Sequence, residues 1–474
     1  MAITEQDYLA HDAMGLAMAI AGGQFSAVEA LEAAAARTAQ VNPKVNAITL
    51  DLTARARREL AERAPSGPLA GVPFLLKDLG PRLAGTATTA SSKLYADEAA
   101  EEDSPLTQLY KAAGLVIFGK TNTPELGLEP VTEPAMFGPT RNPWDLGRTA
   151  GGSSGGAAAA VAAGIVPAAH ASDGGGSIRI PASCCGLFGL KPSRALVSSA
   201  PGDEGWGGFS CGHVVSRSVR DSALLLDIAA HPQPGDPYWT APPAEPFLAA
   251  AERDPTSLRV AFTTAAFSAA GIEPECAEAV RAAAKLCENL GHRVEEADPP
   301  IDRASLAAAG VVISASIAAD LDTVALKRGR PIAEDEVEPI TWTSYQRGRT
   351  ISGSAYIQAL RGAHALGRAV ARFFQRHDIL ICSTLGSPAI PVGYLQGEPL
   401  DLDGYAGRLF AFMPNTQAFN VTGQPAASVP LAMSSGGLPI GVQFVARQAE
   451  DALLLSLCGQ LERAAPWSGR RAKL

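Results

Sequence analysis

The chain has 474 residues, of which 47% are hydrophobic and 18% charged, a composition typical of globular proteins and unlike that of disordered ones. Its formal net charge is −9 without a basic patch, which disfavours nucleic acid as a partner. The N-terminus lacks the basic segment of a signal peptide, and apolar runs such as 157–171 are too short to span a bilayer. Seven cysteines form no C-x-x-C pair, so we expect reduced thiols in a cytoplasmic protein, without a membrane, metal or cofactor.

Apolar spacing predicts an alternation of helices and strands. In chain order, the predicted elements are helices over 6–40 with a break at Gly22-Gly23, a helix over 46–63, strands over 72–76 and 115–120, a helix over 157–164, a strand over 258–262, a helix over 274–290, a strand near Val294, mostly helix over 303–374, and strands over 379–382 and 440–445. This succession predicts an α/β fold, with a large mixed, twisted sheet covered by helices on both faces.

No composition shift or linker divides the chain, so residues 1–474 are predicted to form a single domain. Stretches rich in proline and glycine at 199–208, 231–246 and 386–404 are expected to be surface loops, because helices and strands resume on both sides. The segments 198–250 and 303–410 are predicted to form the roof of a substrate cleft.

Three short motifs carry the candidate chemistry. Lys77 follows four apolar residues, Ser153 lies in Gly151-Gly152-Ser153-Ser154-Gly155-Gly156, and Ser177 follows three glycines in Asp173-Gly-Gly-Gly-Ser177-Ile-Arg179. Each has an ordinary structural explanation alone: a strand-end lysine that reaches solvent, a linker or helix N-terminus, and a tight turn. In combination they indicate a hydrolase in which a lysine activates a serine.

The same residues carry a family resemblance. The blocks that match are Gly71-Val-Pro-Phe-Leu-Leu-Lys77-Asp, Gly119-Lys-Thr-Asn-Thr-Pro-Glu125, Thr140-Arg-Asn-Pro-Trp144, the segment 151–192, Phe419-Asn-Val-Thr-Gly-Gln-Pro425 and Gly437-Leu-Pro-Ile-Gly-Val-Gln443. The chain resembles the amidase signature family over nearly its whole length. Within that family it is most similar to hydrolases of nylon-type cyclic amide oligomers and to relatives that cleave carbamates (urethanes).

The resemblance implies the amidase signature fold and a Ser–cis-Ser–Lys triad. Ser177 would be the nucleophile, Ser153 the bridging serine on a non-proline cis peptide bond, and Lys77 the general base. The N–H groups of Gly174, Gly175 and Gly176 match the family's oxyanion loop. A lysine can act as a base only when it is neutral, and burial among apolar neighbours lowers its pKa.

Two other enzymatic interpretations stay open at this point. Gly151-x-Ser153-x-Gly155 fits the nucleophile elbow of α/β-hydrolases, which would make Ser153 the nucleophile of an esterase and would need a late histidine, His364 or His377. Alternatively, the chain is an A-type subunit of a glutamine amidotransferase, which needs partner subunits. A third possibility is a non-enzymatic scaffold, against which the presence of all three triad residues argues.

The substrate is less closely specified than the chemistry. We expect a small neutral, fairly hydrophobic amide, anilide or carbamate, with ester hydrolysis as a side activity. Leu128, Met136 and Phe137 are the candidate substrate contacts, and Phe412 and Met413 are further candidates for an apolar lining. The sequence also leaves open that two copies of this chain form a homodimer.

Overall fold

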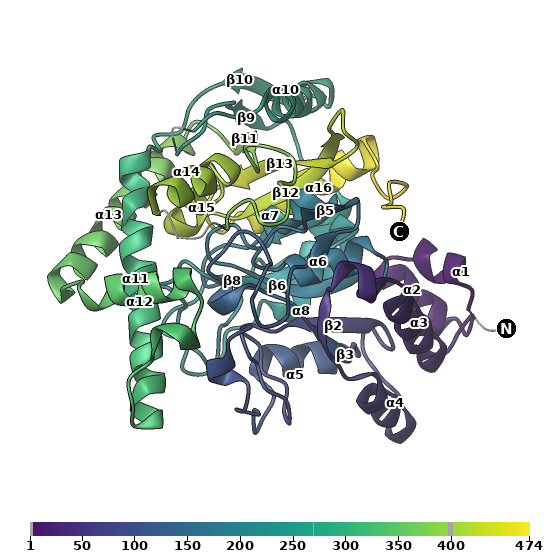
Figure 1. Ribbon diagram of the computed structural model, residues 1–474. Coiled ribbons are helices and arrows are strands. Elements are labelled where there is room, and N and C mark those ends of the chain that lie inside the picture. The colour runs from purple at the N-terminus through teal and green to yellow at the C-terminus, as the bar shows by residue number, and fades with distance from the viewer. Residues whose placement is uncertain (1–2, 269, 397–401) are drawn as a thin grey trace.

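The computed structural model describes residues 3–268, 270–396 and 402–474 (Figure 1). Its strands are β1 Ile48–Asp51, β2 Pro73–Lys77, β3 Val116–Thr121, β4 Arg141–Asn142, β5 Asp145–Thr149, β6 Ala168–Asp173, β7 Phe188–Lys191, β8 Cys211–Ser216, β9 Arg259–Phe262, β10 Arg293–Glu296, β11 Ile379–Ser383, β12 Ala426–Met433 and β13 Pro439–Ala446. Its α-helices are α1 Glu5–Ala10, α2 Ala13–Ala21, α3 Ala27–Val45, α4 Thr53–Glu62, α5 Pro105–Ala112, α6 Gly155–Ala162, α7 Arg179–Cys185, α8 Val219–Ala229, α9 Phe247–Glu252, α10 Pro274–Asn289, α11 Arg303–Arg328, α12 Pro339–Arg349, α13 Gly353–Phe373, α14 Leu402–Phe412, α15 Gln417–Thr422 and α16 Asp451–Ala464.

The centre of the molecule is a mixed sheet in the order β10-β9-β11-β13-β12-β7-β8-β6. β9, β10 and β11 run parallel to one another, and the remaining neighbours are antiparallel. A smaller sheet, β1-β3-β2, lies next to it, with β2 packed beside the edge strand β6 (Figure 1). The predicted α/β class and mixed sheet are therefore confirmed.

Alternate residues of one central strand show that helices cover both faces of the large sheet. Ile379 and Ile381 of β11 belong to the apolar cluster that includes residues of α10 and α16, while Leu380 and Cys382 belong to the cluster formed by α11, α13 and α15. Side chains of a strand point alternately to opposite faces, so a strand buried on both sides is apolar along its whole length. This explains the continuous apolar run that predicted β11.

One predicted helix is wrong in its first half. Residues 48–51 form β1, which pairs antiparallel with β3, and only 53–62 are helical. The chain turns at Asn46, whose φ of 51° ends α3, and the Asn42 side chain accepts hydrogen bonds from the N–H groups of Ala47 and Ile48. Tertiary pairing with β3 thus overrides the local helical pattern.

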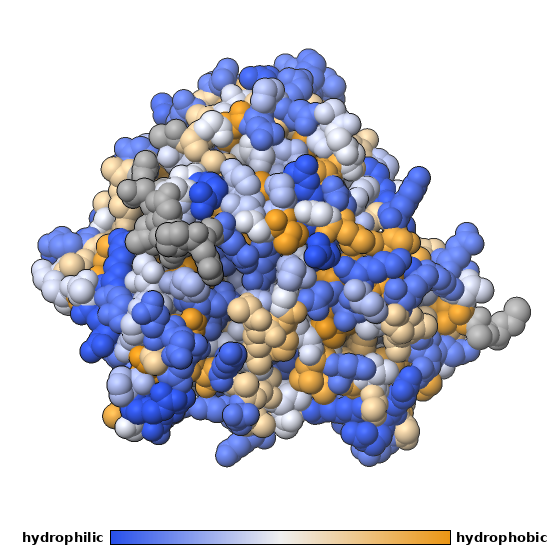
Figure 2. All heavy atoms as spheres, viewed as in Figure 1, coloured by the Kyte–Doolittle hydropathy of each residue, from blue (hydrophilic) through white to orange (hydrophobic). Residues whose placement is uncertain are grey.

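The helix α11 contains a longer apolar segment than the run 157–171 named from the sequence. Its residues Leu306–Arg328 are long and apolar enough to cross a membrane by length and composition alone. However, the helix packs against α12 and α13, and its buried side chains contribute to two separate apolar clusters. The surface over α11 and α12 is largely hydrophilic in Figure 2, as expected for a helix that packs part of its apolar surface against the protein.

The crossing of α11 and α12 gives a test of the fold. A Cβ on Gly348 would lie 2.0 Å from the carbonyl oxygen of Ser314, so Gly348→Ala should lower the free energy of unfolding by about 1–3 kcal/mol. Urea unfolding followed by circular dichroism measures this. Gly353→Ala is the control, because a Cβ there meets nothing within 4 Å. Equal stability of both variants would contradict the close helix crossing.

Candidate active site

Lys77 is the last residue of β2, and its side chain is completely buried. Its Nζ donates hydrogen bonds to Ser153 Oγ over 2.7 Å and to Ser172 Oγ over 3.0 Å. Burial lowers the pKa of Lys77 from its usual 10.5 to about 7, although the nearby carboxylate of Asp173 acts in the opposite direction. This shift amounts to roughly 5 kcal/mol of destabilisation of the ammonium form. Much of Lys77 is therefore a neutral amine near pH 7.

The two adjacent serines of the first glycine motif have different partners. Ser153 follows a cis peptide bond after Gly152, and its hydroxyl accepts the hydrogen bond from Lys77. The hydroxyl of Ser154 instead accepts from the N–H of Ser172 and donates to its carbonyl oxygen, each over 3.2 Å. Only Ser153 is thus in contact with the lysine.

Close backbone contacts explain the glycines of this motif. A Cβ on Gly152 would lie 2.6 Å from the carbonyl oxygen of Val131, and one on Gly156 would lie 2.4 Å from the backbone nitrogen of Asn122. No other residue fits at either position without a shift of the backbone. The motif that the sequence shows as glycine-rich is therefore a tightly packed turn rather than a flexible linker.

Ser177 and Ser153 line the same cavity, whose volume is about 420 Å³. Ser177 is half-buried, and its carbonyl oxygen accepts a hydrogen bond from the N–H of Ser154 over 3.2 Å, which links the two glycine motifs directly. The structure therefore brings Lys77, Ser153 and Ser177 together. Ser172, which bonds to Lys77 and lines the same cavity, had no role in the sequence analysis.

The three glycines before Ser177 are not equivalent as hydrogen-bond donors. The N–H of Gly176 donates to Asp173 Oδ1 over 2.7 Å, so that predicted oxyanion donor is already occupied. The N–H groups of Gly174, Gly175 and Ser177 make no hydrogen bond within the described part of the chain. Gly176 has a φ of +138°, and a Cβ there would clash with Thr416. The free donors of this loop are therefore Gly174, Gly175 and the serine itself.

A buried ion pair holds the second glycine motif in place. The carboxylate of Asp173 accepts from Arg179 Nε over 2.9 Å and from Nη2 over 2.8 Å, and neither side chain is exposed. Arg179 also donates to the carbonyl oxygen of Thr416 and to the side-chain oxygens of Asn420 and Gln443. Burial alone would raise the pKa of Asp173, but Arg179 and Asn420 together bring it to about 2. Asp173 is therefore a permanent carboxylate.

The predicted substrate contacts Leu128, Met136 and Phe137 do not line this cavity, which is a correction to the sequence analysis. The turn Glu125–Gly127 places Leu126 and Gly127 at the cavity instead. Leu126 has a φ of 51°, so the chain reverses there and Leu128 packs with the apolar cluster of α11 and α12.

Met136 and Phe137 lie in a segment that is held elsewhere. The Asn46 side chain donates to the carbonyl oxygen of Phe137 over 2.8 Å, which ties this stretch to the end of α3.

The segments 198–250 and 303–410 do contribute to the cavity, through residues 198–212 and through Ser316, Ile317 and Asp320 of α11. Part of the second predicted segment, 397–401, lies outside the described residues.

The nucleophile-elbow interpretation lacks its histidine. His364 is exposed on α13, and His377 Nε2 is hydrogen-bonded to Glu295 Oε1 over 2.7 Å; neither lines the cavity. His170 does line the cavity, but burial, together with the charges of Lys77 and His213, lowers its pKa to about 3. The partner that the structure gives Ser153 is a lysine.

Comparison with known proteins agrees with this geometry. The amidase family profile matches residues 29–455. This chain belongs to the amidase signature family. It is 39% identical to 6-aminohexanoate-cyclic-dimer hydrolase of Paenarthrobacter ureafaciens, over 98% of this chain and 96% of the relative.

Solved structures give the same result for the fold. A 6-aminohexanoate cyclic dimer hydrolase in complex with its substrate superposes with a TM-score of 0.93, at 39% identity over 98% of this chain and 99% of that one. A bacterial aryl acylamidase of the amidase signature family superposes with a TM-score of 0.87, at 27% identity over 97% and 99% of the two chains. This amidase is therefore an amidohydrolase with the fold that the sequence predicted.

The ion pair beneath the glycine loop predicts a large effect on stability. Asp173→Asn keeps the shape of the side chain but leaves the guanidinium of Arg179 buried without a counter-charge, which should cost about 3–5 kcal/mol of folding free energy. Chemical denaturation measures this loss. The control Asp254→Asn breaks an exposed pair with Arg463 and should cost no more than about 1 kcal/mol. A small effect for Asp173→Asn would show that the pair does not hold the loop.

Proposed function

We propose that this amidase hydrolyses amides, and also carbamates, through an acyl-enzyme formed on Ser177, with Ser153 as the proton relay and Lys77 as the general base. The observation that carries the proposal is the hydrogen bond of 2.7 Å between Lys77 Nζ and Ser153 Oγ at the buried end of a cavity that Ser177 also lines. A lysine with a pKa of about 7 can accept a proton at neutral pH.

The proposed reaction has two stages. Neutral Lys77 takes the proton of Ser153 as Ser153 takes that of Ser177, and the Ser177 alkoxide attacks the carbonyl carbon. The N–H groups of Gly174 and Gly175, which have no hydrogen-bond partner among the described residues, stabilise the negative oxygen in this proposal. The relay then returns the proton to the leaving amine, the C–N bond breaks, and water attacks the acyl-enzyme through the same groups.

Several observations support a neutral, fairly apolar substrate. Leu79, Ala90, Leu106, Leu126 and Ile317 contribute apolar walls to the cavity. The relatives are named for hydrolysis of a cyclic amide dimer and of aryl acylamides. We therefore propose aliphatic amides, anilides and aryl carbamates as substrates, since a carbamate presents the same carbonyl carbon and the same C–N bond to the nucleophile.

The lysine predicts a pH dependence. Because only the neutral amine can act as the base, kcat/KM should rise with pH and level off above an apparent pKa near 7. Lys77→Arg keeps a permanent charge and should lower kcat/KM at least about a hundredfold at every pH. The exposed substitution Lys93→Arg is the control and should leave the profile unchanged. An active Lys77→Arg enzyme would rule out Lys77 as the base.

The nucleophile is tested with three substrates: N-hexylacetamide, 4-nitroacetanilide and ethyl N-phenylcarbamate. Ser177→Ala should lower kcat about a thousandfold or more on every substrate that the wild type cleaves, because the acyl-enzyme cannot form. The exposed Ser435→Ala serves as the matched control. Activity that survives in Ser177→Ala but not in Ser153→Ala would move the nucleophile to Ser153. A wild type that cleaves only glutamine, and only with added partner subunits, would indicate an amidotransferase subunit.

A further inference from the structure

Four successive residues at the cavity wall have a left-handed backbone, and one of them is a tryptophan. The φ angles are 58° at Gly205, 49° at Trp206, 61° at Gly207 and 82° at Gly208. Glycine adopts this conformation readily, whereas a large aromatic residue does so at a steric cost. A bulky residue kept in such a conformation beside a catalytic cavity is a reason to look for a function.

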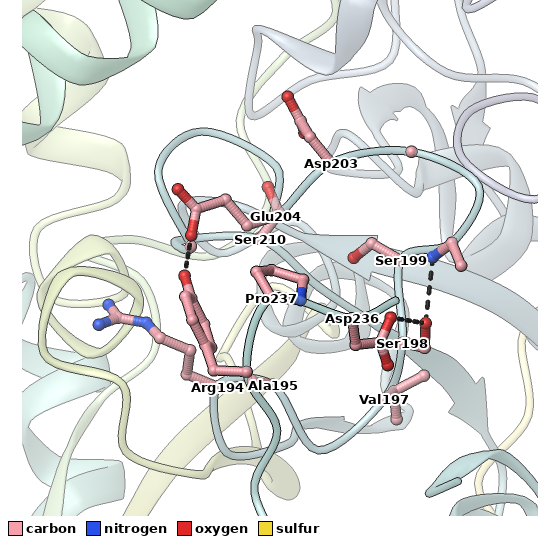
Figure 3. Close-up of a pocket in the computed structure, with 14 residues that line it drawn as sticks. Arg194, Ala195, Val197, Ser198, Ser199, Asp203, Glu204, Ser210, Asp236 and Pro237 are labelled. Atoms are coloured by element: carbon pink, nitrogen blue, oxygen red, sulfur yellow. Dashed lines mark hydrogen bonds between the residues drawn. The ribbon is translucent and has the colours of Figure 1, made fainter. Parts of the chain in front are cut away.

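The turn is held by contacts from its outer side. The N–H of Gly205 donates to Asp203 Oδ1 over 2.7 Å, and the carboxylate of Glu204 accepts a hydrogen bond from the hydroxyl of Tyr238 (Figure 3). The guanidinium of Arg194 lies 5.5 Å from the centre of the Phe209 ring. These contacts fix the loop before any substrate enters, so the position of the indole is set by the fold.

The inner side of the turn brings the indole against the glycine loop. A Cβ on Gly174 would lie 2.7 Å from Cε3 and Cζ3 of Trp206 and 2.9 Å from Ser210 Oγ, so the ring occupies much of the space that a side chain at this position would need. Trp206, Gly174 and Ser177 line the same cavity. The N–H of Gly174 is one of the proposed oxyanion donors, so the indole lies against a residue of the proposed oxyanion loop.

We infer that Trp206 is a specificity-determining residue: its indole forms the wall against which a flat aromatic group next to the scissile C–N bond packs, and Gly174 is a glycine in this chain to make room for that ring. The inference rests on the proposed function and adds the substrate class. Aromatic groups pack against one another in offset or edge-to-face arrangements, which an alkyl chain cannot reproduce. Anilides and aryl carbamates should therefore be favoured over aliphatic amides of similar size.

Binding to a protein that cannot form the acyl-enzyme tests the inference separately from catalysis. In the Ser177→Ala background, calorimetry gives the dissociation constants of 4-nitroacetanilide and N-hexylacetamide. Adding Trp206→Ala should weaken binding of the anilide about tenfold more than binding of the alkyl amide, while Trp206→Phe should restore most of the difference. The control Trp239→Ala removes an indole that is 60% exposed and should change neither constant.

The pairing of Trp206 with Gly174 adds a second test that a merely structural role would not pass. Gly174→Ala should weaken anilide binding about as much as Trp206→Ala, because its methyl group displaces the ring. In a Trp206→Ala protein the same substitution should have little further effect, so the two changes should be strongly non-additive.

The outcomes separate this inference from the proposed function. Equal weakening of both ligands by Trp206→Ala, or additive effects of Gly174→Ala and Trp206→Ala, would overturn the role of Trp206 even if the wild type hydrolyses both amides. A selective loss of anilide binding would uphold that role even if the wild type cleaved neither amide, a result that would contradict the proposed function alone.

Discussion

The ion pair between Asp173 and Arg179 is the contact on which the site depends. It joins the end of β6 to the start of α7, and Arg179 also binds groups of α15 and β13. A charge pair without solvent is maintained only when its remaining hydrogen-bonding groups are satisfied, and here Thr416, Asn420 and Gln443 satisfy them. The glycine loop between the two charges is thereby held in one conformation, in which the N–H groups of Gly174 and Gly175 have no hydrogen-bond partner among the described residues.

The same buried region holds two basic side chains in different surroundings. Arg179 has a carboxylate within hydrogen-bond distance, whereas among the described residues Lys77 Nζ is hydrogen-bonded to the hydroxyls of Ser153 and Ser172. Asp173 is close enough to favour the ammonium form of Lys77, but burial outweighs it. Burial without a directly paired carboxylate therefore lowers the pKa of Lys77 far enough for the amine to act as a base.

The sequence predicts the chemistry of the site better than its walls. Lys77, Ser153 and Ser177 lie in short motifs, and close contacts require glycine at positions such as Gly152, Gly156 and Gly176, so both the composition and the spacing of these motifs carry information. The strand β6 gave no such signal, because Ala168, Ala169 and Ala171 have little preference for a strand and only the pairing with β8 defines it.

The lining of the cavity depends on backbone geometry that composition does not reveal. Because Leu126 has a positive φ, Leu126 and Gly127 line the cavity in place of the predicted Leu128. The left-handed turn at Trp206 brings a segment distant in sequence against Gly174. Apolar periodicity predicts the helices within 5–45, 274–289 and 303–373 and strands such as β2, β3, β11 and β13, but it did not predict β7, β8 and β12 or the helices α8 and α16. Local periodicity does not predict that 48–51 is a strand and only 53–62 a helix, because the pairing of β1 with β3 is a long-range contact.

The proposed base ends a strand of one sheet, and the loop that carries the proposed nucleophile Ser177 follows a strand of the other. Lys77 ends β2 of the small sheet, whereas Ser172 and Asp173 end β6 at the edge of the large one, and the two strands are packed side by side without a shared ladder. A slip of one sheet along the other would lengthen the contact from Lys77 to Ser172 while each sheet kept its own hydrogen bonds. A fall in catalytic rate would therefore report a shift at the junction of β2 and β6. Circular dichroism, which records total helix and strand content, would not detect such a local change.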